Sequence, residues 1–192
     1  YKDSSPTVSP FRRMDIPPAV DGAIAFIVTS DERAKRLKSQ PVYITAATQS
    51  IVRGTQFKTG YYRDSITDIP GIKNVGQRLY EESGLSPKEI DAVQIEDSFA
   101  ALVPMQLEAL GFCEPGTGVD YINNGDRIRS DGETPVNTSG GSIGEGCLHG
   151  INHIAEAVFQ LRGSSTAQVE NANHVLVATG ACGPASGLIL RR

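Results

Sequence analysis

The sequence predicts a layered α/β fold, in which helices pack against a sheet. Residues 22–30 and 175–179 are short, nearly continuous apolar runs, which are typical of strands buried on both faces. Residues 72–82 and 151–162 instead repeat apolar residues at the spacing of one helical face. Segments of the two kinds alternate along the chain, and this alternation favours one layered sheet over separate helical or all-β domains.

The N-terminal part of the chain predicts few elements. Four prolines make its first 20 residues a loop rather than the start of a domain. Asp31 is a suitable N-cap for a short helix that follows the first apolar run. The expected elements are a loop over 1–20, a strand over 22–30, a helix over 32–38, a strand over 41–47 and a loop over 48–72. Loops as long as the last one are often functional.

The remaining residues predict regular alternation. Gly84 ends the helix over 72–82, and Ser86-Pro87-Lys88-Glu89 is a capping box that opens a single turn. We expect Pro104 to kink the first turns of the helix over 98–110. The other elements are a strand over 91–96, a turn-rich stretch over 113–134, a glycine-rich loop over 137–150, a helix over 151–162, a strand over 175–179, a turn over 180–187 and a closing strand over 188–190.

The glycine-rich loop over 137–150 is the most informative segment. Its glycines allow positive φ angles and a close approach of backbone to a ligand. The helix after it would present free N–H groups and the positive end of its dipole. Glu145, Cys147 and His149 place a carboxylate, a thiol and an imidazole in the same window. This combination indicates an active-site loop.

Motifs in order along most of the chain carry a family resemblance. They are Gly140-Gly141, Gly146-Cys147-Leu148-His149-Gly150, Gln160-Leu161-Arg162-Gly163, Glu96-Asp97-Ser98-Phe99, the apolar run that follows Asp21, and Cys182-Gly183-Pro184-Ala185-Ser186-Gly187. The chain resembles the C-terminal half of the thiolase superfamily, in its lipid-transfer, sterol-carrier-protein-X-type branch. The resemblance implies a thiolase-like βαβαβ-type half, with a mixed sheet flanked by helices.

The resemblance also implies a domain division and a reaction. Residues 1–38 would be the tail of a thiolase N-terminal domain, and residues 39–192 the C-terminal domain. The preceding half of a longer protein would carry the acyl-accepting cysteine. The implied activity is thiolysis or retro-aldol cleavage of a lipid or steroid side-chain acyl-CoA, with no cofactor beyond the thioester substrate. A non-catalytic subunit that binds acyl-CoA or supports a partner is the alternative.

The implied catalytic residues are Cys147, His149, Glu96 and Cys182. Thiolases usually have a histidine where this chain has Cys147, and a cysteine is a poorer base unless a helix N-terminus lowers its pKa. Its alternative role is that of a small core residue. Glu96 replaces an asparagine or histidine, so it acts as a base, stays neutral through burial, or has no chemical role. Cys182 is offset by one residue from the family's cysteine, and both roles stay open.

Other candidates would bind the substrate or serve structure. Backbone N–H groups of the glycine-rich loop and of the turn at Cys182 would stabilise a thioester oxyanion. Tyr61 and Tyr62 are candidate phenolic acids, and Asp97 is expected to cap the helix that starts at Ser98. The residues expected to contact acyl-CoA are Asn137, Ser139, Gly140, Gly141, Gly146 and Gly183.

A metal site is a further candidate that the sequence does not favour. His149 and His153 are four residues apart, and Glu145 and Glu156 flank them, so the four could converge on one helical face. Hydrogen bonds from Asn152 and His153 to neighbouring backbone are the preferred reading. We therefore predict no metal.

Net charge, apolar runs and cysteine count limit the kinds of partner and compartment that we expect. The net charge of −4 gives no reason to expect nucleic acid or an acidic membrane as a partner, and no apolar run reaches the length of about 20 residues that spans a bilayer. Three sparse cysteines favour a reducing, cytoplasmic compartment. Family resemblance adds a homodimer and an OB-fold, zinc-ribbon accessory protein.

Overall fold

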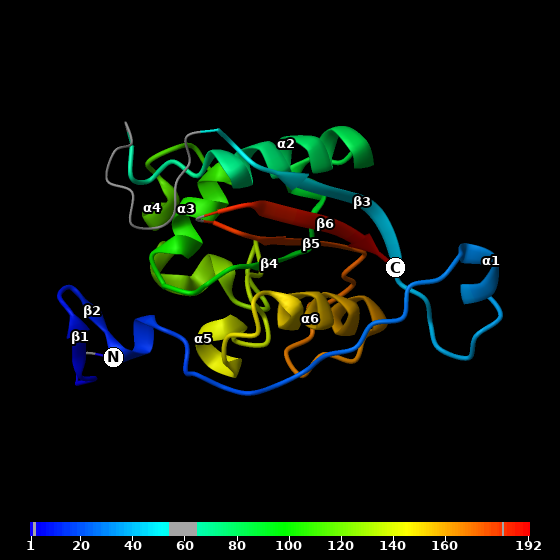
Figure 1. Cartoon of the computed structure of the whole chain (residues 1–192), viewed down its shortest axis with the longest axis horizontal. Helices are drawn as coiled ribbons and strands as arrows, with labels where there is room; N and C mark the ends of the chain where they lie inside the picture. Colours follow the sequence, from blue (N-terminus) through cyan, green and yellow to red (C-terminus); the bar gives the residue numbers. More distant parts are fainter. Residues whose placement is uncertain (2, 54–64, 182) are drawn as a thin grey trace.

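A mixed sheet forms the centre of the protein (Figure 1). The computed structural model describes residues 1, 3–53, 65–181 and 183–192. Two of its four strands are parallel to each other, and the other neighbouring pairs are antiparallel. In spatial order the strands are β3 (Tyr43–Ser50), β6 (Ala185–Arg191), β5 (His174–Thr179) and β4 (Ala92–Ile95). The predicted α/β class with a mixed sheet is confirmed.

Helices cover both faces of this sheet (Figure 1). On one face lie α2 (Pro70–Ser83) and α3 (Leu102–Ala109), and on the other lies α6 (Ile151–Arg162). Side chains of β5 alternate between the two layers. Leu176 packs in the same cluster as the buried residues of α2, whereas Val175 and Val177 pack with Ala157 and Leu161 of α6. This alternation explains why the β5 sequence is continuously apolar.

Short elements complete the described chain. They are β1 (Pro6–Val8), β2 (Phe11–Arg12), η1 (Arg13–Asp15), α1 (Asp31–Ala34), η2 (Pro87–Glu89), α4 (Gly118–Ile122), η3 (Asn123–Ile128) and α5 (Gly141–Glu145). Among helices of the described residues, none is both long and apolar enough to cross a membrane.

Several predicted boundaries are confirmed because strong local signals set them. The helix over 151–162 has the predicted bounds, between glycines on either side. Gly84 ends α2 in the left-handed conformation, with φ of 72°. The predicted capping box also forms, since the Ser86 N–H donates to the Glu89 carboxylate over 2.9 Å. The closing strand starts earlier than predicted, at Ala185.

The predicted strand over 22–30 is wrong. These residues carry no strand assignment, and Ile27 and Val28 are 92% and 78% exposed. The segment belongs to an extended N-terminal arm that runs past α5 and α6 (Figure 1). A strand needs a neighbour for its backbone N–H and C=O groups, and no strand of the described residues pairs with this segment.

Three other predicted elements are corrected. The helix over 32–38 is the single turn α1, and Ser30 rather than Asp31 is its N-cap. The helix over 98–110 begins later, at Leu102, which places Pro104 in the first turn, where its missing N–H has no intrahelical partner to lose. The turn-rich stretch over 113–134 contains α4 and η3.

Candidate functional site

The glycine-rich loop contains the short helix α5 rather than loop alone. Four of its glycines have positive φ, and at two of these four neighbouring groups also leave no room for a side chain. A Cβ on Gly141 (φ 61°) would lie 2.3 Å from Oδ2 of Asp97, and one on Gly146 (φ 105°) would lie 2.3 Å from a Val20 methyl group. These close approaches are to the protein itself. Contacts of Gly140, Gly141 and Gly146 with acyl-CoA stay a prediction.

Asp97 binds the N-terminal end of a helix, but not of the helix that we expected. Its buried carboxylate accepts hydrogen bonds from the N–H groups of Ser142 at 2.8 Å and Ile143 at 3.0 Å, so it caps α5. The predicted cap of a helix at Ser98 is wrong, because α3 starts only at Leu102. Burial raises the pKa of Asp97, but hydrogen bonds from His153 and from these two N–H groups outweigh it and hold the pKa below its ordinary value.

His153 is buried beside Asp97. It lies in α6, whereas His149 precedes that helix. The Nε2 of His153 lies 3.4 Å from both Asp97 Oδ1 and Ser142 Oγ, so its partners are side chains and not the predicted backbone groups. A Ser-His-Asp relay needs a different ring nitrogen for each partner, and here both partners share Nε2. We therefore assign these three side chains a structural role, in which they join α5 to α6.

The four residues considered for a metal do not converge. His149 is exposed and lies before Gly150, the N-cap of α6, so it does not share a helical face with His153. Glu156 accepts hydrogen bonds from Thr138, Gln160 and Ser165 instead. Across the part of the chain that the structure describes, no group of three or more His, Cys, Asp or Glu side chains is placed to hold a metal ion.

Glu96 binds the turn between β5 and β6. Its Oε2 accepts hydrogen bonds from the N–H groups of Gly180 at 2.8 Å and Ala181 at 3.0 Å. The hydroxyl of Ser98 donates to Oε1. All three contacts use the carboxylate as an acceptor, which is the role of its ionised form. Of the three roles considered for Glu96, the neutral carboxyl fits these contacts least.

Asn137 and Ser139 lead into α5. The Asn137 amide accepts from the Ile95 N–H at 2.8 Å and donates to the Ile95 carbonyl at 2.9 Å, so it continues the pairing at the end of β4. The buried Oγ of Ser139 has no hydrogen-bond partner among the described residues. Asn137 therefore has a structural role, and the predicted substrate contacts of both residues stay untested.

Of the two cysteines predicted to be catalytic, the structure describes Cys147 but not Cys182. Cys147 is a half-buried free thiol, so the alternative of a core residue does not describe it. Cys182 lies outside the described residues, as do Tyr61 and Tyr62. Gly183, next to Cys182, donates its N–H to the Gly180 carbonyl at 3.3 Å. The catalytic roles of Cys147 and Cys182 stay predictions.

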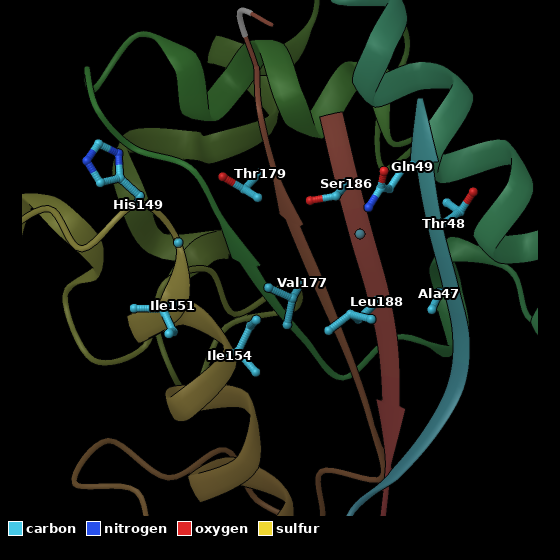
Figure 2. A pocket seen from close by; sticks show the side chains of 12 residues that line it. Ala47, Thr48, Gln49, His149, Ile151, Ile154, Val177, Thr179, Ser186 and Leu188 are labelled. Atoms are coloured by element: carbon cyan, nitrogen blue, oxygen red, sulfur yellow. The ribbon is translucent and has the colours of Figure 1, made fainter. Parts of the chain in front are cut away.

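A pocket of about 550 Å³ opens between α6 and the exposed face of β3 and β6 (Figure 2). The polar residues His149, Thr179 and Ser186 line one end, with the imidazole of His149 at its edge, while Ile154, Val177 and Leu188 line the other (Figure 2). Of the predicted catalytic residues, His149 lines this pocket. The sequence analysis missed Thr179 and Ser186. Their positions in the sequence could have indicated them, because Thr179 ends one predicted strand and Ser186 shortly precedes the next.

Comparison with known proteins matches residues 55–190 to the family described as thiolase C-terminal domain-like. The chain belongs to this family. Its resemblance to the C-terminal half of a thiolase-type protein is thereby confirmed. The solved structure of the "Ltp2-ChsH2(DUF35) aldolase" superposes with a TM-score of 0.93 and 43% identity, over 99% of this chain and 50% of that chain.

Curated relatives of this thiolase-type chain have different named activities. It is 41% identical to the 17-hydroxy-3-oxo-4-pregnene-20-carboxyl-CoA lyase of Mycobacterium tuberculosis, over 99% of this chain and 49% of the relative. It is 43% identical to a steroid side-chain-cleaving aldolase of Thermomonospora curvata, over 99% and 48%. Sterol carrier protein 2 of Oryctolagus cuniculus is 34% identical over 77% of this chain and 28% of the relative. The chain spans about half the length of the first two relatives.

Proposed function

We propose that this chain is the C-terminal half of an acyl-CoA enzyme that cleaves a steroid side chain by a retro-aldol reaction. The observation that carries the proposal is the identity of 41–43%, over 99% of the chain, to two proteins named for cleavage of this kind. Identity to an acetyl-CoA acetyltransferase is 35% over 88% of the chain. The domain division at residues 38 and 39 belongs to the same proposal.

Cys147 supports retro-aldol chemistry over thiolysis. Thiolysis requires a base that activates the thiol of coenzyme A, and this chain has a cysteine where thiolases usually have a histidine. A retro-aldol reaction has no attacking thiol. A base removes the proton of the β-hydroxyl group, the bond between the α and β carbons breaks, and its electron pair forms the thioester enolate. A proton then adds to the α carbon, and the other product is a ketone.

The polar end of the pocket is the proposed place for this chemistry. His149 is close to the N-terminal end of α6, where the helix dipole favours a developing negative charge on the thioester oxygen. The N–H groups of Ser142, Ile143, Gly180 and Ala181 already bind carboxylates, so we assign them no role in an oxyanion hole. We propose His149 as the base and Cys147, whose neutral thiol is a proton donor, as the acid.

The proposal includes partners. The substrate is an acyl-CoA, and no cofactor beyond that thioester is required. The name of the solved relative includes a second component, ChsH2(DUF35), which supports an accessory subunit for this protein. A homodimer, which the family resemblance implies, and a cytoplasmic location, which the sparse cysteines favour, remain parts of the proposal.

The test is turnover by the full-length protein with its accessory subunit. The substrate is a steroid with a 17-hydroxyl group and a 20-carboxyl-CoA side chain, and the products are identified by mass spectrometry. We expect a 17-ketosteroid together with a shorter acyl-CoA. Recovery of intact substrate, bound to the protein, would overturn the proposal in favour of the non-catalytic acyl-CoA-binding subunit.

A further inference from the structure

We propose that Glu96 and Asp97 are positioning residues, each of which fixes one of the two loops that border the candidate site. The two carboxylates are adjacent in the sequence, directly after β4, and they bind different loops. Asp97 binds the start of α5, and Glu96 binds the turn after β5. The inference rests on the proposed function for its catalytic consequence, but not for its structural part.

Asp97 uses both of its oxygens to hold α5. Oδ1 accepts from the Ser142 N–H and Oδ2 from the Ile143 N–H, and His153 approaches Oδ1 at 3.4 Å. The residue is 3% exposed, so water cannot readily replace these partners. Gly141 fits only because it has no side chain to meet Oδ2. The position of α5, and of Cys147 just beyond it, therefore depends on an ionised Asp97.

Glu96 accepts from the two N–H groups described for its loop with one oxygen. Oε2 accepts from both Gly180 and Ala181, while Oε1 receives the hydroxyl of Ser98. The turn is tight at this point, since Gly180 has φ of 90° and a Cβ there would lie 2.1 Å from the Pro184 carbonyl oxygen. This turn leads directly to the polar end of the pocket at Ser186.

The two carboxylates therefore respond differently to replacement by an amide. In Glu96→Gln the one remaining oxygen can still accept both backbone N–H groups, and the new NH₂ group faces a hydroxyl, which can accept. In Asp97→Asn one of the two N–H groups faces an NH₂ donor and loses its acceptor. Asp97→Asn should release α5, Glu96→Gln should leave both loops in place, and Glu96→Ala should release only the turn.

The test is amide hydrogen exchange by mass spectrometry on the full-length protein, with peptides that separate residues 139–146 from residues 178–184. We expect exchange around Ser142 and Ile143 to accelerate at least about tenfold in Asp97→Asn, with no change around Gly180 and Ala181. Glu96→Ala should give the reverse pattern. The control is Glu170→Gln, an exposed carboxylate just before β5, which should change neither peptide.

Two additions keep the test decisive. Gly141→Ala places a methyl group against Asp97 Oδ2 and should reproduce the exchange pattern of Asp97→Asn if that variant does not fold. In variants that turn over substrate, kcat should fall at least about tenfold with KM within threefold, since a displaced loop alters the reacting geometry. Equal acceleration in both peptides, or none in Asp97→Asn, would overturn the inference. Loop-specific exchange without turnover would contradict the proposed function alone.

Discussion

Residues 22–30 and strand β5 share an apolar sequence pattern, but β5 is buried and much of 22–30 is exposed. Both are short apolar runs that predict a buried strand. In the structure, β5 lies between β4 and β6, and Leu176 at its centre is fully buried. Residues 22–30 lie in an extended arm, and Ile27 is 92% exposed. An apolar run thus indicates that a segment requires burial, but the partners that provide it are set elsewhere in the chain.

The largest expected difference between these regions is in side-chain truncation. Leu176→Ala removes a fully buried side chain between β5 and α2 and should lower the free energy of unfolding by about 2–5 kcal/mol. Ile27→Ala should change it by no more than about 0.5 kcal/mol. Denaturant unfolding of both variants measures the difference. Comparable losses would show that the arm is packed like the sheet.

Adding a methyl group to β6 tests the packing of the sheet by overfilling it, whereas truncation leaves a cavity. A Cβ on Gly187 would lie 2.6 Å from a Val75 methyl group and 2.9 Å from one of Leu79, so Gly187→Ala should cost about 1–3 kcal/mol through overpacking. Gly183→Ala is the matched control, because a Cβ there would meet no atom within 4 Å. Thermal unfolding compares the two, and equal midpoints would contradict tight packing of α2 on β6.

Loss of one hydroxyl group should have a smaller effect. Tyr80 donates from its phenol to the Leu110 carbonyl at 2.9 Å, and burial raises its pKa far above the ordinary value. Tyr80→Phe should lower the free energy of unfolding by about 0.5–1.5 kcal/mol. Tyr1→Phe removes the hydrogen bond from an exposed tyrosine to Asp15 and should cost less. A larger loss in Tyr1→Phe would reverse the ranking of core and arm.

The smallest expected signal is the acid dependence that Asp97 contributes. Its folded-state pKa is lowered, so its contribution is complete above the ordinary aspartate pKa of about 3.9 and is lost as the pH falls below that value. Asp97→Asn should therefore be less sensitive to acid than the natural chain between pH 5 and about 3. Urea unfolding across that range tests this, and parallel curves for the two proteins would contradict it.

Local signals made some of the structure predictable. The helix over 151–162 has an apolar stripe and flanking glycines, so its bounds follow from neighbouring residues. The capping role of Asp97 was predicted for the wrong helix, because its partners are 45 and 46 residues later in the sequence. No spacing rule reports such a contact. Thr179 and Ser186 were missed for the same reason, since sheet pairing alone places them side by side.

Dependence on free coenzyme A tests the central proposal most directly. The full-length protein, with its accessory subunit, would be given the 17-hydroxy steroid acyl-CoA while the concentration of free coenzyme A is varied from zero upward. Retro-aldol cleavage consumes no thiol, so we expect full activity without coenzyme A and no rise as it is added. Cleavage that is absent without coenzyme A and saturates as it is added would contradict the proposal and assign thiolysis to this protein.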